Sequence, residues 1–281
     1  MKASNPHVQI LYILGHEHCG STILEYHLSQ QPGVFGAGEV SLLPRIVDSN
    51  CEPQLRRCSC GAEPIVQCPI WRAVDQSCRE IGGKGLADID PMSANSDVFR
   101  NDNELLFSAI ARVAGARVII DSSKGSTRLS RLIRETRLKV SVVHVTRPFA
   151  GYAYSHKKKY DVGLREILWK FVDYARHSKR TTARGAARLE FLRFEDLLAD
   201  PEEVRRSLVG SMVPHDMNAM PRSGASSEGF HSLAGNNVRF YPEPLKASRT
   251  SVNFNAFSLH QRIALRTLDN IAQVFRPFTS L

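Results

Sequence analysis

The sequence predicts an α/β fold built on a doubly wound, mainly parallel sheet of five strands, and two observations indicate it. Short apolar runs alternate with helix-like segments along the 281 residues, as in folds whose parallel strands are joined by helices. The clearest of these runs are β-branched and nearly continuous, which is typical of strands buried on both faces. The expected strands are 8–14, 34–37, 116–121, 140–146 and 189–193.

The helices are expected between and after these strands. Their predicted ranges are 23–29, 104–114, 127–137, about 164–180, 202–209 and 258–274. Residues 45–100 break the alternation and hold most of the cysteines, so we interpret them as an insertion covering the ligand-binding edge of the sheet. We therefore predict a single domain over residues 1–281. It carries the insertion at about 45–100 and an irregular C-terminal segment at about 201–281, in which residues 214–229 form a mobile loop.

Length and composition agree with a globular domain. The chain is 42% hydrophobic, which is enough to bury a full core. No run approaches 18 apolar residues, so we expect no membrane span. The N-terminal region lacks the layout of a signal peptide, and its apolar stretch fits a first strand better. We expect a cytoplasmic protein.

Positive charge is concentrated in one segment. The formal net charge is +9, and residues 122–160 hold ten Lys or Arg but one acid. Such a field attracts an anionic ligand, a polyanion or a nucleic acid. Arg128, Arg131, Arg134 and Arg137 recur about three residues apart, so for these four we expect a solvated helix face.

Four cysteines, Cys51, Cys58, Cys60 and Cys68, form the pattern C-x6-C-x-C-x7-C. This pattern lacks the two C-x2-C knuckles of common zinc sites. Free thiols packing the insertion are favoured, because a cytoplasmic chain usually keeps its cysteines reduced. A disulfide and a bound structural metal remain open alternatives.

The segment GHEHCGST, residues 15–22, joins the first strand to the first helix. Gly15 and Gly20 allow a tight loop, and Ser21 and Thr22 open the helix, whose N–H groups and dipole attract an anion. The spacing is almost that of a nucleotide-binding P-loop, but Ser21 occupies the lysine position. This predicts a P-loop-like fold that binds a phosphate-bearing ligand, and it argues against a small-molecule kinase.

Four segments together resemble the sulfotransferases that use 3'-phosphoadenosine 5'-phosphosulfate (PAPS). The loop His18-Cys19-Gly20-Ser21-Thr22 resembles their R-S-G-[ST]-T loop, which holds the 5'-phosphosulfate. Arg147 with Ser155 eight residues later resembles their pair for the 3'-phosphate. LRFEDLLADP at 192–201 and HSLAGNNVRF at 231–240 also resemble segments of this family. The second segment includes Arg239, and the resemblance implies that this arginine contacts the nucleotide.

The resemblance implies that PAPS is the co-substrate and that 3'-phosphoadenosine 5'-phosphate (PAP) is the product. PAPS carries a phosphosulfate and a 3'-phosphate at opposite ends of an adenosine, so it needs two separate anion sites. Arg147 gives a charged donor for the 3'-phosphate site. No metal is expected, since the loop itself can stabilise the charge on departing PAP. The cofactor-binding residues expected are His18, Cys19, Gly20, Ser21, Thr22, Arg147, Ser155 and Arg239.

Sulfuryl transfer also needs a base for the acceptor hydroxyl. Glu39, in VFGAGEVSLL, is the first candidate, because this stretch resembles that of the base glutamate in tyrosylprotein sulfotransferases. A helix-capping carboxylate is the alternative for Glu39. Lys124, just beyond the third strand, is the candidate for neutralising charge on PAP, with a surface lysine as its alternative.

His18 departs from the family pattern, which usually has Arg or Lys there. We expect it to contact the 5'-phosphate or the sulfuryl group, with an imidazolium held by the anion as one form. Its neighbour Cys19 fits a small residue in the usual serine position, and a thiolate stabilised by the helix N-terminus is the alternative.

The acceptor is not identified by the sequence. Sulfotransferases of this kind modify sugars, lipids, phenols, peptides and natural products, so we expect a small-molecule, carbohydrate, peptide or natural-product acceptor. No nucleic-acid partner is expected, because no basic platform interleaved with aromatic residues is present. A homodimer is left open. The alternatives to a sulfotransferase are a small-molecule kinase and a non-catalytic polyanion-binding protein.

Overall fold

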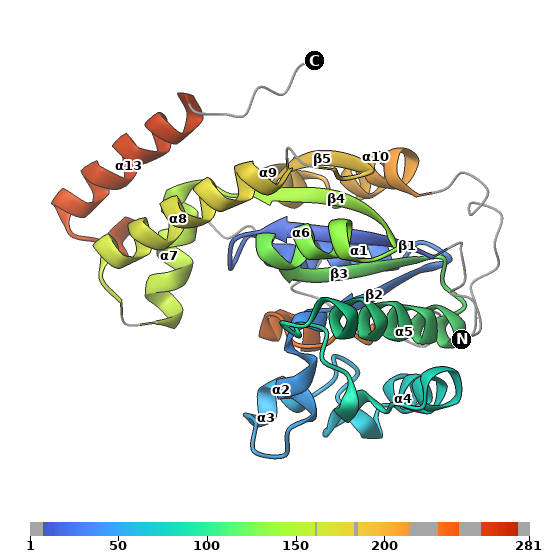
Figure 1. Cartoon of the computed structure of the whole chain (residues 1–281). Coiled ribbons are helices and arrows are strands. Elements are labelled where there is room, and N and C mark those ends of the chain that lie inside the picture. Colours follow the sequence, from blue (N-terminus) through green and yellow to red (C-terminus); the bar gives the residue numbers. More distant parts are fainter. Residues whose placement is uncertain (1–7, 161, 183–184, 214–229, 242–253, 275–281) are drawn as a thin grey trace.

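A five-stranded parallel sheet forms the centre of the computed structural model, which describes residues 8–160, 162–182, 185–213, 230–241 and 254–274 (Figure 1). The strand order is β2-β3-β1-β4-β5, and every neighbouring pair is parallel. The predicted sheet is therefore confirmed. The strands are β1 Gln9–Gly15, β2 Val34–Gly38, β3 Val118–Lys124, β4 Lys139–Thr146 and β5 Arg188–Arg193.

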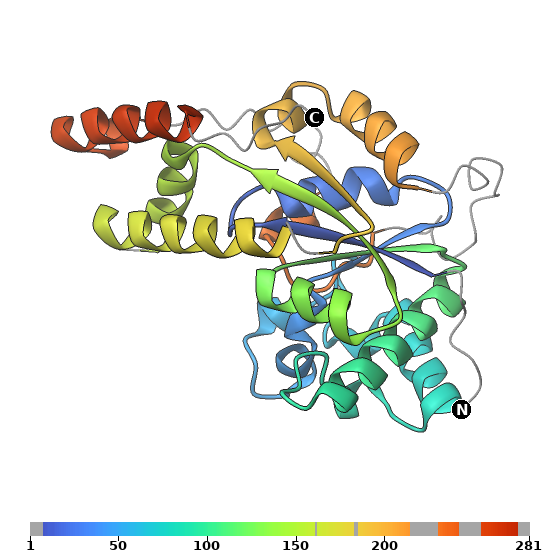
Figure 2. The same ribbon diagram turned by 45° about the horizontal axis from the view of Figure 1, so that its top comes forward.

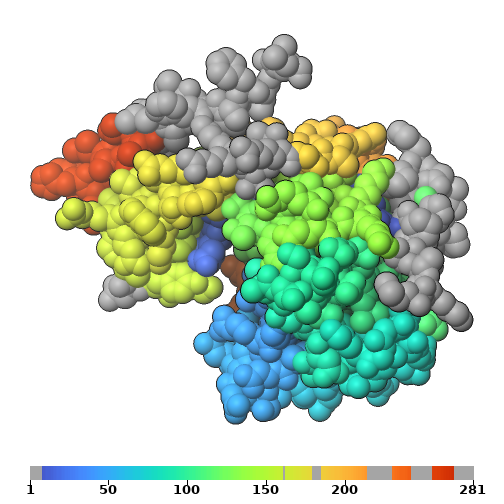
Figure 3. All heavy atoms as spheres, in the orientation of Figure 1, coloured from blue at the N-terminus to red at the C-terminus, as the bar shows by residue number. Residues whose placement is uncertain are grey.

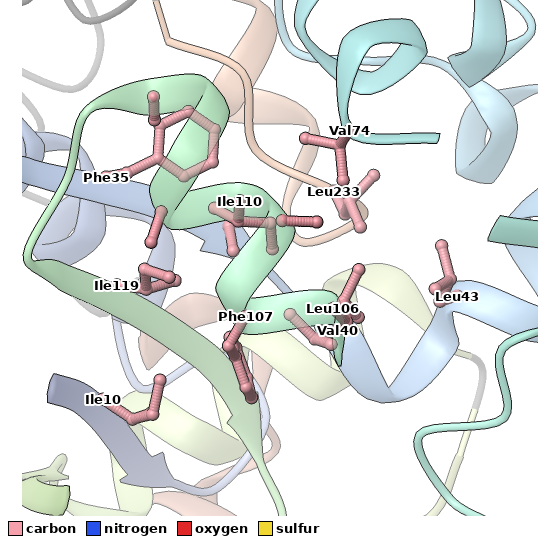
Figure 4. Close-up of a cluster of buried hydrophobic side chains, with 14 of the residues drawn as sticks. Ile10, Phe35, Val40, Leu43, Val74, Leu106, Phe107, Ile110, Ile119 and Leu233 are labelled. Atoms are coloured by element: carbon pink, nitrogen blue, oxygen red, sulfur yellow. The ribbon is translucent and has the colours of Figure 1, made fainter. Parts of the chain in front are cut away.

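Alternate side chains of β1 enter different cores, because successive residues of a strand point to opposite faces of a sheet. Ile10 and Tyr12 pack with the helices α5 (Ser96–Ala114) and α6 (Ser126–Glu135). Figure 4 shows this core, with Ile10 and Phe35 near side chains of α5. Leu11 and Ile13 pack on the other face, against α1 (Ser21–Ser29), α9 (Phe194–Ala199) and α10 (Pro201–Met212).

A third group of helices extends from the β4 side of the sheet, as Figures 1 and 2 show. It comprises α7 (Phe149–Lys159), α8 (Leu164–Thr182) and α13 (Leu259–Val274). These helices share a separate apolar cluster that includes Phe149, Ile167 and Leu265. This arrangement sets α7 and α8 beside the carboxyl end of β4.

The segment between β2 and β3 is more helical than predicted. It contains η1 (Val40–Leu42), α2 (Leu43–Val47), α3 (Pro53–Arg56), η2 (Ile65–Gln67), α4 (Pro69–Gly82), η3 (Leu86–Asp88) and α5. The side chain of Asn95 caps α5 by accepting from Asp97 N and Val98 N, so this helix begins well before the predicted residue 104. Trp71 of α4 is fully buried, so α4 belongs to the main core.

The expected solvated face of α6 is wrong for Arg128. This side chain is 1% exposed, and its Nε donates to Asp121 Oδ2 at 3.0 Å. Two further donations go to Pro91 O at 2.6 Å and Asn103 Oδ1 at 2.8 Å. The guanidinium is thus a structural group that joins α6 to β3, to the middle of α5 and to Pro91 before that helix.

None of the helices in the described ranges is long and apolar enough to cross a membrane. The six cysteines are all free thiols, so the disulfide alternative does not apply to this structure. The expected mobile loop at 214–229 lies outside the described residues.

Candidate active site

The carboxyl ends of the strands border a cavity of about 680 Å³. Figure 3 shows the molecule hollowed on this side, between the α7–α8 region and the body of the sheet. Ligands of open parallel sheets bind at this edge. Eight of the predicted site residues line the cavity: His18, Gly20, Ser21, Thr22, Glu39, Lys124, Arg147 and Ser155.

The loop after β1 forms one wall. Gly20 has a φ of +98°, and a Cβ there would lie 2.3 Å from the ring of Phe194, so only glycine fits. Helix α1 begins at the next residue, Ser21. Its first N–H groups have no partner inside the helix, and together with the helix dipole they make an anion site at the cavity wall.

Cys19 is fully buried and does not line the cavity. Its sulfur fills space beside Gly15, where an added Cβ would lie 2.5 Å from it. Burial raises the pKa of the Cys19 thiol. The structure therefore favours the small-residue interpretation over the reactive thiolate, and it places no Cys19 side-chain contact in the predicted phosphate site.

His18 faces the cavity in a left-handed backbone conformation, with a φ of +60°. Burial, followed by the positive charge of Lys159, lowers its pKa to about 3. The ring is therefore neutral near pH 7 in its protein surroundings, whereas the imidazolium held by a bound anion stays a prediction. Its Nε2 is buried without a hydrogen-bond partner in the described part of the chain. A neutral ring remains a hydrogen-bonding group for a ligand.

Arg147 and Ser155 come together as the sequence predicts. The Nη1 of Arg147, just after β4, donates to Ser155 Oγ on α7 at 3.0 Å and to His18 O at 2.8 Å. The guanidinium lies 4.4 Å above the ring of Phe194. Both hydrogen-bond acceptors are neutral, and burial lowers the pKa of Arg147. A desolvated cation at a cavity wall is a strong site for an anion.

Glu39, just after β2, and Lys124, the last residue of β3, form an ion pair at the cavity wall. Lys124 Nζ contacts Glu39 Oε1, and both side chains are mostly buried, at 14% and 17% exposed. Lys124 adopts a left-handed conformation, with a φ of +65°, at the end of β3. The N–H of Glu39 donates to Leu233 O at 2.9 Å, which fixes the backbone of this carboxylate against the C-terminal segment.

Arg239 has a different position from the one expected. It is 3% exposed and absent from the cavity wall. Its guanidinium donates to three main-chain oxygens, Gly235 O at 2.9 Å, Gln54 O at 2.7 Å and Arg57 O at 3.2 Å. Arg239 thus holds the turn at Gly235, and its neighbours Gly235, Asn236 and Val238 line the cavity.

Sequence reasoning missed two tyrosines at the wall beside Ser155. Tyr152 of α7 and Tyr160, just after this helix, line the cavity together with Lys159. The ring of His156 lies 5.2 Å from that of His18 and 4.2 Å from that of Tyr152. The signal was present, because positions 152, 155 or 156 and 159 recur at helical spacing on one face of α7. Tyr174 of α8 also lines the cavity.

No protein-family model matches the chain, and no curated protein does. Among solved structures, the sulfotransferase domain of the Synechococcus PCC 7002 olefin synthase is similar, with 16% identity over 100% of both chains and a TM-score of 0.50. The sulfotransferase STF1 from Mycobacterium tuberculosis H37Rv has 14% identity, over 79% of this chain and 70% of that chain, with a TM-score of 0.45. A sulfotransferase from Alicyclobacillus acidocaldarius has 15% identity, over 78% and 87%, with a TM-score of 0.38.

The first of these matches spans both chains completely, and it shows the fold. The chain therefore has the P-loop-like α/β fold of sulfotransferases, as its motifs indicate.

Proposed function

We propose that the protein transfers a sulfuryl group from PAPS to a hydroxyl or phenol acceptor and releases PAP. One observation carries this proposal: the loop before α1, Arg147 with Ser155, and a carboxylate all line a single cavity. We propose the loop that ends at Ser21 as the first anion site and Arg147 with Ser155 as the second. The carboxylate is that of Glu39.

The chemistry of these residues fits the donor. PAP carries a phosphate at each end of an adenosine, so it requires two anion sites in one pocket. Here the sites lie on different elements, α1 and the β4–α7 connection, and the pocket size is within the range of about 300–1,000 Å³ that is usual for small ligands. The Nε2 of His18, which has no hydrogen-bond partner among the described residues, adds a neutral group to the loop.

Glu39 is suited to the role of base. When bound, the donor would supply the sulfuryl group and a phosphate-ester leaving group. Glu39 then accepts the proton that the acceptor hydroxyl loses. Its partner Lys124 holds the carboxylate in place and keeps an ammonium group at the cavity wall, where negative charge develops.

The missing P-loop lysine is explained by other cations at the same cavity. Lys124, Arg147 and Lys159 all line it: Lys124 ends β3, Arg147 follows β4, and Lys159 ends α7. In our proposal these groups and the loop N–H groups neutralise the departing phosphate ester, so the reaction needs no metal ion.

Calorimetric titration of the purified protein tests this function. PAP is compared with ATP plus Mg²⁺ under the same conditions. The proposal predicts micromolar binding of PAP and much weaker binding of Mg-ATP. ATP lacks the 3'-phosphate that Arg147 and Ser155 bind in this proposal. Preference for Mg-ATP, or binding of neither ligand, would contradict the proposal and favour a kinase or a polyanion-binding protein.

A further inference from the structure

Three cysteines and one histidine meet at a place that the proposed reaction does not use. Cys58 and Cys60 follow α3, Cys68 precedes α4, and His231 belongs to the C-terminal segment. One ligand atom from each residue lies within 4.8 Å of the ligand atoms of the other three. His231 is separated from Cys58 by 173 residues and from Cys68 by 163, so the fold alone creates this cluster.

The distances suit a tetrahedral ion. The Nδ1 of His231 lies 3.2 Å from Cys68 Sγ and 3.8 Å from Cys58 Sγ. A tetrahedral zinc site with Zn–S of about 2.3 Å and Zn–N of about 2.0–2.1 Å places its sulfur and nitrogen atoms about 3.6 Å apart. A neutral Nδ1 accepts one hydrogen bond, so two thiol groups directed at it are better explained by a shared cation.

The environment is that of a structural site. Cys58 and Cys68 are fully buried, and His231 is 5% exposed. Cys60 is exposed, so an ion can reach the cluster from this side. Gly61, with a φ of +99°, allows the tight turn in which its N–H donates to Cys58 O at 2.9 Å. This turn brings the two cysteines of C-x-C to one side.

The histidine and the third cysteine are each held in place. His231 O accepts from Trp71 Nε1 at 2.8 Å, and the neighbouring Ser232 N–H donates to Ser59 Oγ at 2.7 Å. Cys68 is the N-cap residue of the 14-residue helix α4. The positive end of that helix stabilises a thiolate, which is the form of cysteine that binds metal.

We propose that Cys58, Cys60, Cys68 and His231 bind one Zn²⁺ ion in a closed, four-coordinate structural site. Thiolate and imidazole ligands in a tetrahedral set select zinc. A Cys58–Cys68 disulfide would leave Cys60 and His231 without a role, so it explains fewer of the observations.

The proposed ion would anchor the segment that borders the active-site cavity. Residues 231–236 run from His231 past Leu233, which bridges to Gly38 at the end of β2 and accepts from Glu39 N at 2.9 Å. Figure 4 shows Leu233 beside Val74 of α4, in the same apolar core. A metal that closes so long a stretch of chain removes much entropy from the unfolded state, so it stabilises the fold.

Metal analysis of the full chain, purified without a metal-affinity step, tests this inference. We expect about one zinc per chain in the wild type and its loss in Cys58→Ser and Cys68→Ser. Cys51→Ser is the matched control, because Cys51 lies in the same segment but outside the cluster, and it should retain zinc. His231→Cys keeps a four-ligand set and should retain zinc, whereas His231→Ala should lower it.

Cobalt substitution gives a second measurement that does not depend on how the variants fold. Co²⁺ in the wild type should show the intense visible absorption of a tetrahedral ion and thiolate-to-cobalt charge transfer in the near ultraviolet. Two results would overturn the inference: wild-type protein without zinc that also fails to bind Co²⁺, or a Cys58–Cys68 disulfide found by mass spectrometry of the unreduced protein. Neither measurement depends on sulfotransferase activity.

Discussion

Arg128 and Arg147 are both buried cations near the carboxyl edge of the sheet, but their surroundings differ. Arg128, at 1% exposed, meets the carboxylate of Asp121, a main-chain oxygen and the amide of Asn103. Arg147, at 8% exposed, donates to a hydroxyl and a main-chain oxygen and borders the cavity. The charge of Arg128 is compensated inside the protein, whereas that of Arg147 is available to a ligand.

Within the basic segment 122–160, Arg128 therefore serves the stability of the fold, whereas Arg147 is placed to bind a ligand. Removing one partner of a buried ion pair leaves an uncompensated charge and destabilises the fold. Removing a buried cation that lacks a carboxylate partner relieves its desolvation cost and takes away a binding group. The comparison therefore predicts that charged residues at the cavity wall affect binding and turnover, while those in the Arg128 network affect folding.

The largest effect on the cavity side is expected for Glu39→Gln. Loss of a general base lowers turnover by about 10²–10⁴-fold. The affinity for PAP should remain close to that of the wild type, because the amide keeps the shape of the side chain. The melting temperature should fall, because Lys124 loses its carboxylate partner. PAP release from PAPS, measured with an acceptor panel of phenols and sugars, checks the turnover, and calorimetry checks the binding.

Glu17→Gln is the matched control for Glu39→Gln, because Glu17 also lines the cavity but is exposed. It should change turnover little. Substantial residual activity in Glu39→Gln would remove this carboxylate from the role of base. It would also contradict the expectation that charged residues at the cavity wall, unlike the Arg128 network, determine turnover.

On the structural side, Arg128→Ala should lower the free energy of unfolding by about 3–5 kcal/mol, since it leaves Asp121 buried and unpaired. Arg134→Ala, on the exposed side of the same helix, should stay within about 0.5 kcal/mol of the wild type. Urea denaturation of the two variants measures both values. Equal stability of the two variants would show that the Arg128 network is not structural.

A smaller effect concerns the pH dependence of stability. Burial lowers the pKa of His16 and of His144 to about 4. Between pH 6.5 and about 4, the unfolded chain therefore binds protons at these histidines that the native state does not, so their contribution to stability falls as the pH falls. Each group contributes a slope of up to about 1.4 kcal/mol per pH unit.

Glu25 acts in the opposite direction in the same window. Burial raises its pKa to about 7, so between pH 4.5 and 7 the native state holds a proton that the unfolded state lacks. Urea denaturation at pH 7, 6 and 5 should thus give a shallower loss of stability for His144→Gln than for the wild type, and a steeper loss for Glu25→Gln. His260→Gln, at an exposed position, should follow the wild type. Identical slopes for all variants would contradict the assigned shifts.

The strands were predictable because their signal is local. Each strand of the sheet contains a short run of apolar residues, mostly β-branched in β3 and β4, and all five expected runs became strands. The first half of α5 was missed because SDVFRNDN is largely polar and is held as a helix by the Asn95 cap. The loop and the Arg147–Ser155 pair were predictable because both resemble phosphate-binding motifs of PAPS-dependent sulfotransferases, and the two side chains of the pair do meet.

Other site features depend on contacts between distant segments, which spacing does not reveal. Arg128 followed the same helical spacing as exposed Arg134, and Asp121 and Asn103 decided its burial. The direction of Arg239 is set by main-chain oxygens of residues 54 and 57. His231 joins the cysteine cluster from beyond 160 residues of chain, so no local pattern could show a Cys3His set.

The most direct measurement of the central claim is a comparison of PAP with adenosine 5'-phosphate, which lacks the 3'-phosphate, in the wild type and in Arg147→Ala. A hydrogen-bonded charged group is worth about 1.5–3 kcal/mol, so the wild type should prefer PAP by roughly 10–100-fold. In Arg147→Ala the preference should nearly vanish, while Lys158→Ala, at an exposed position on α7, should keep it. An unchanged preference for PAP in Arg147→Ala would show that the second anion site lies elsewhere.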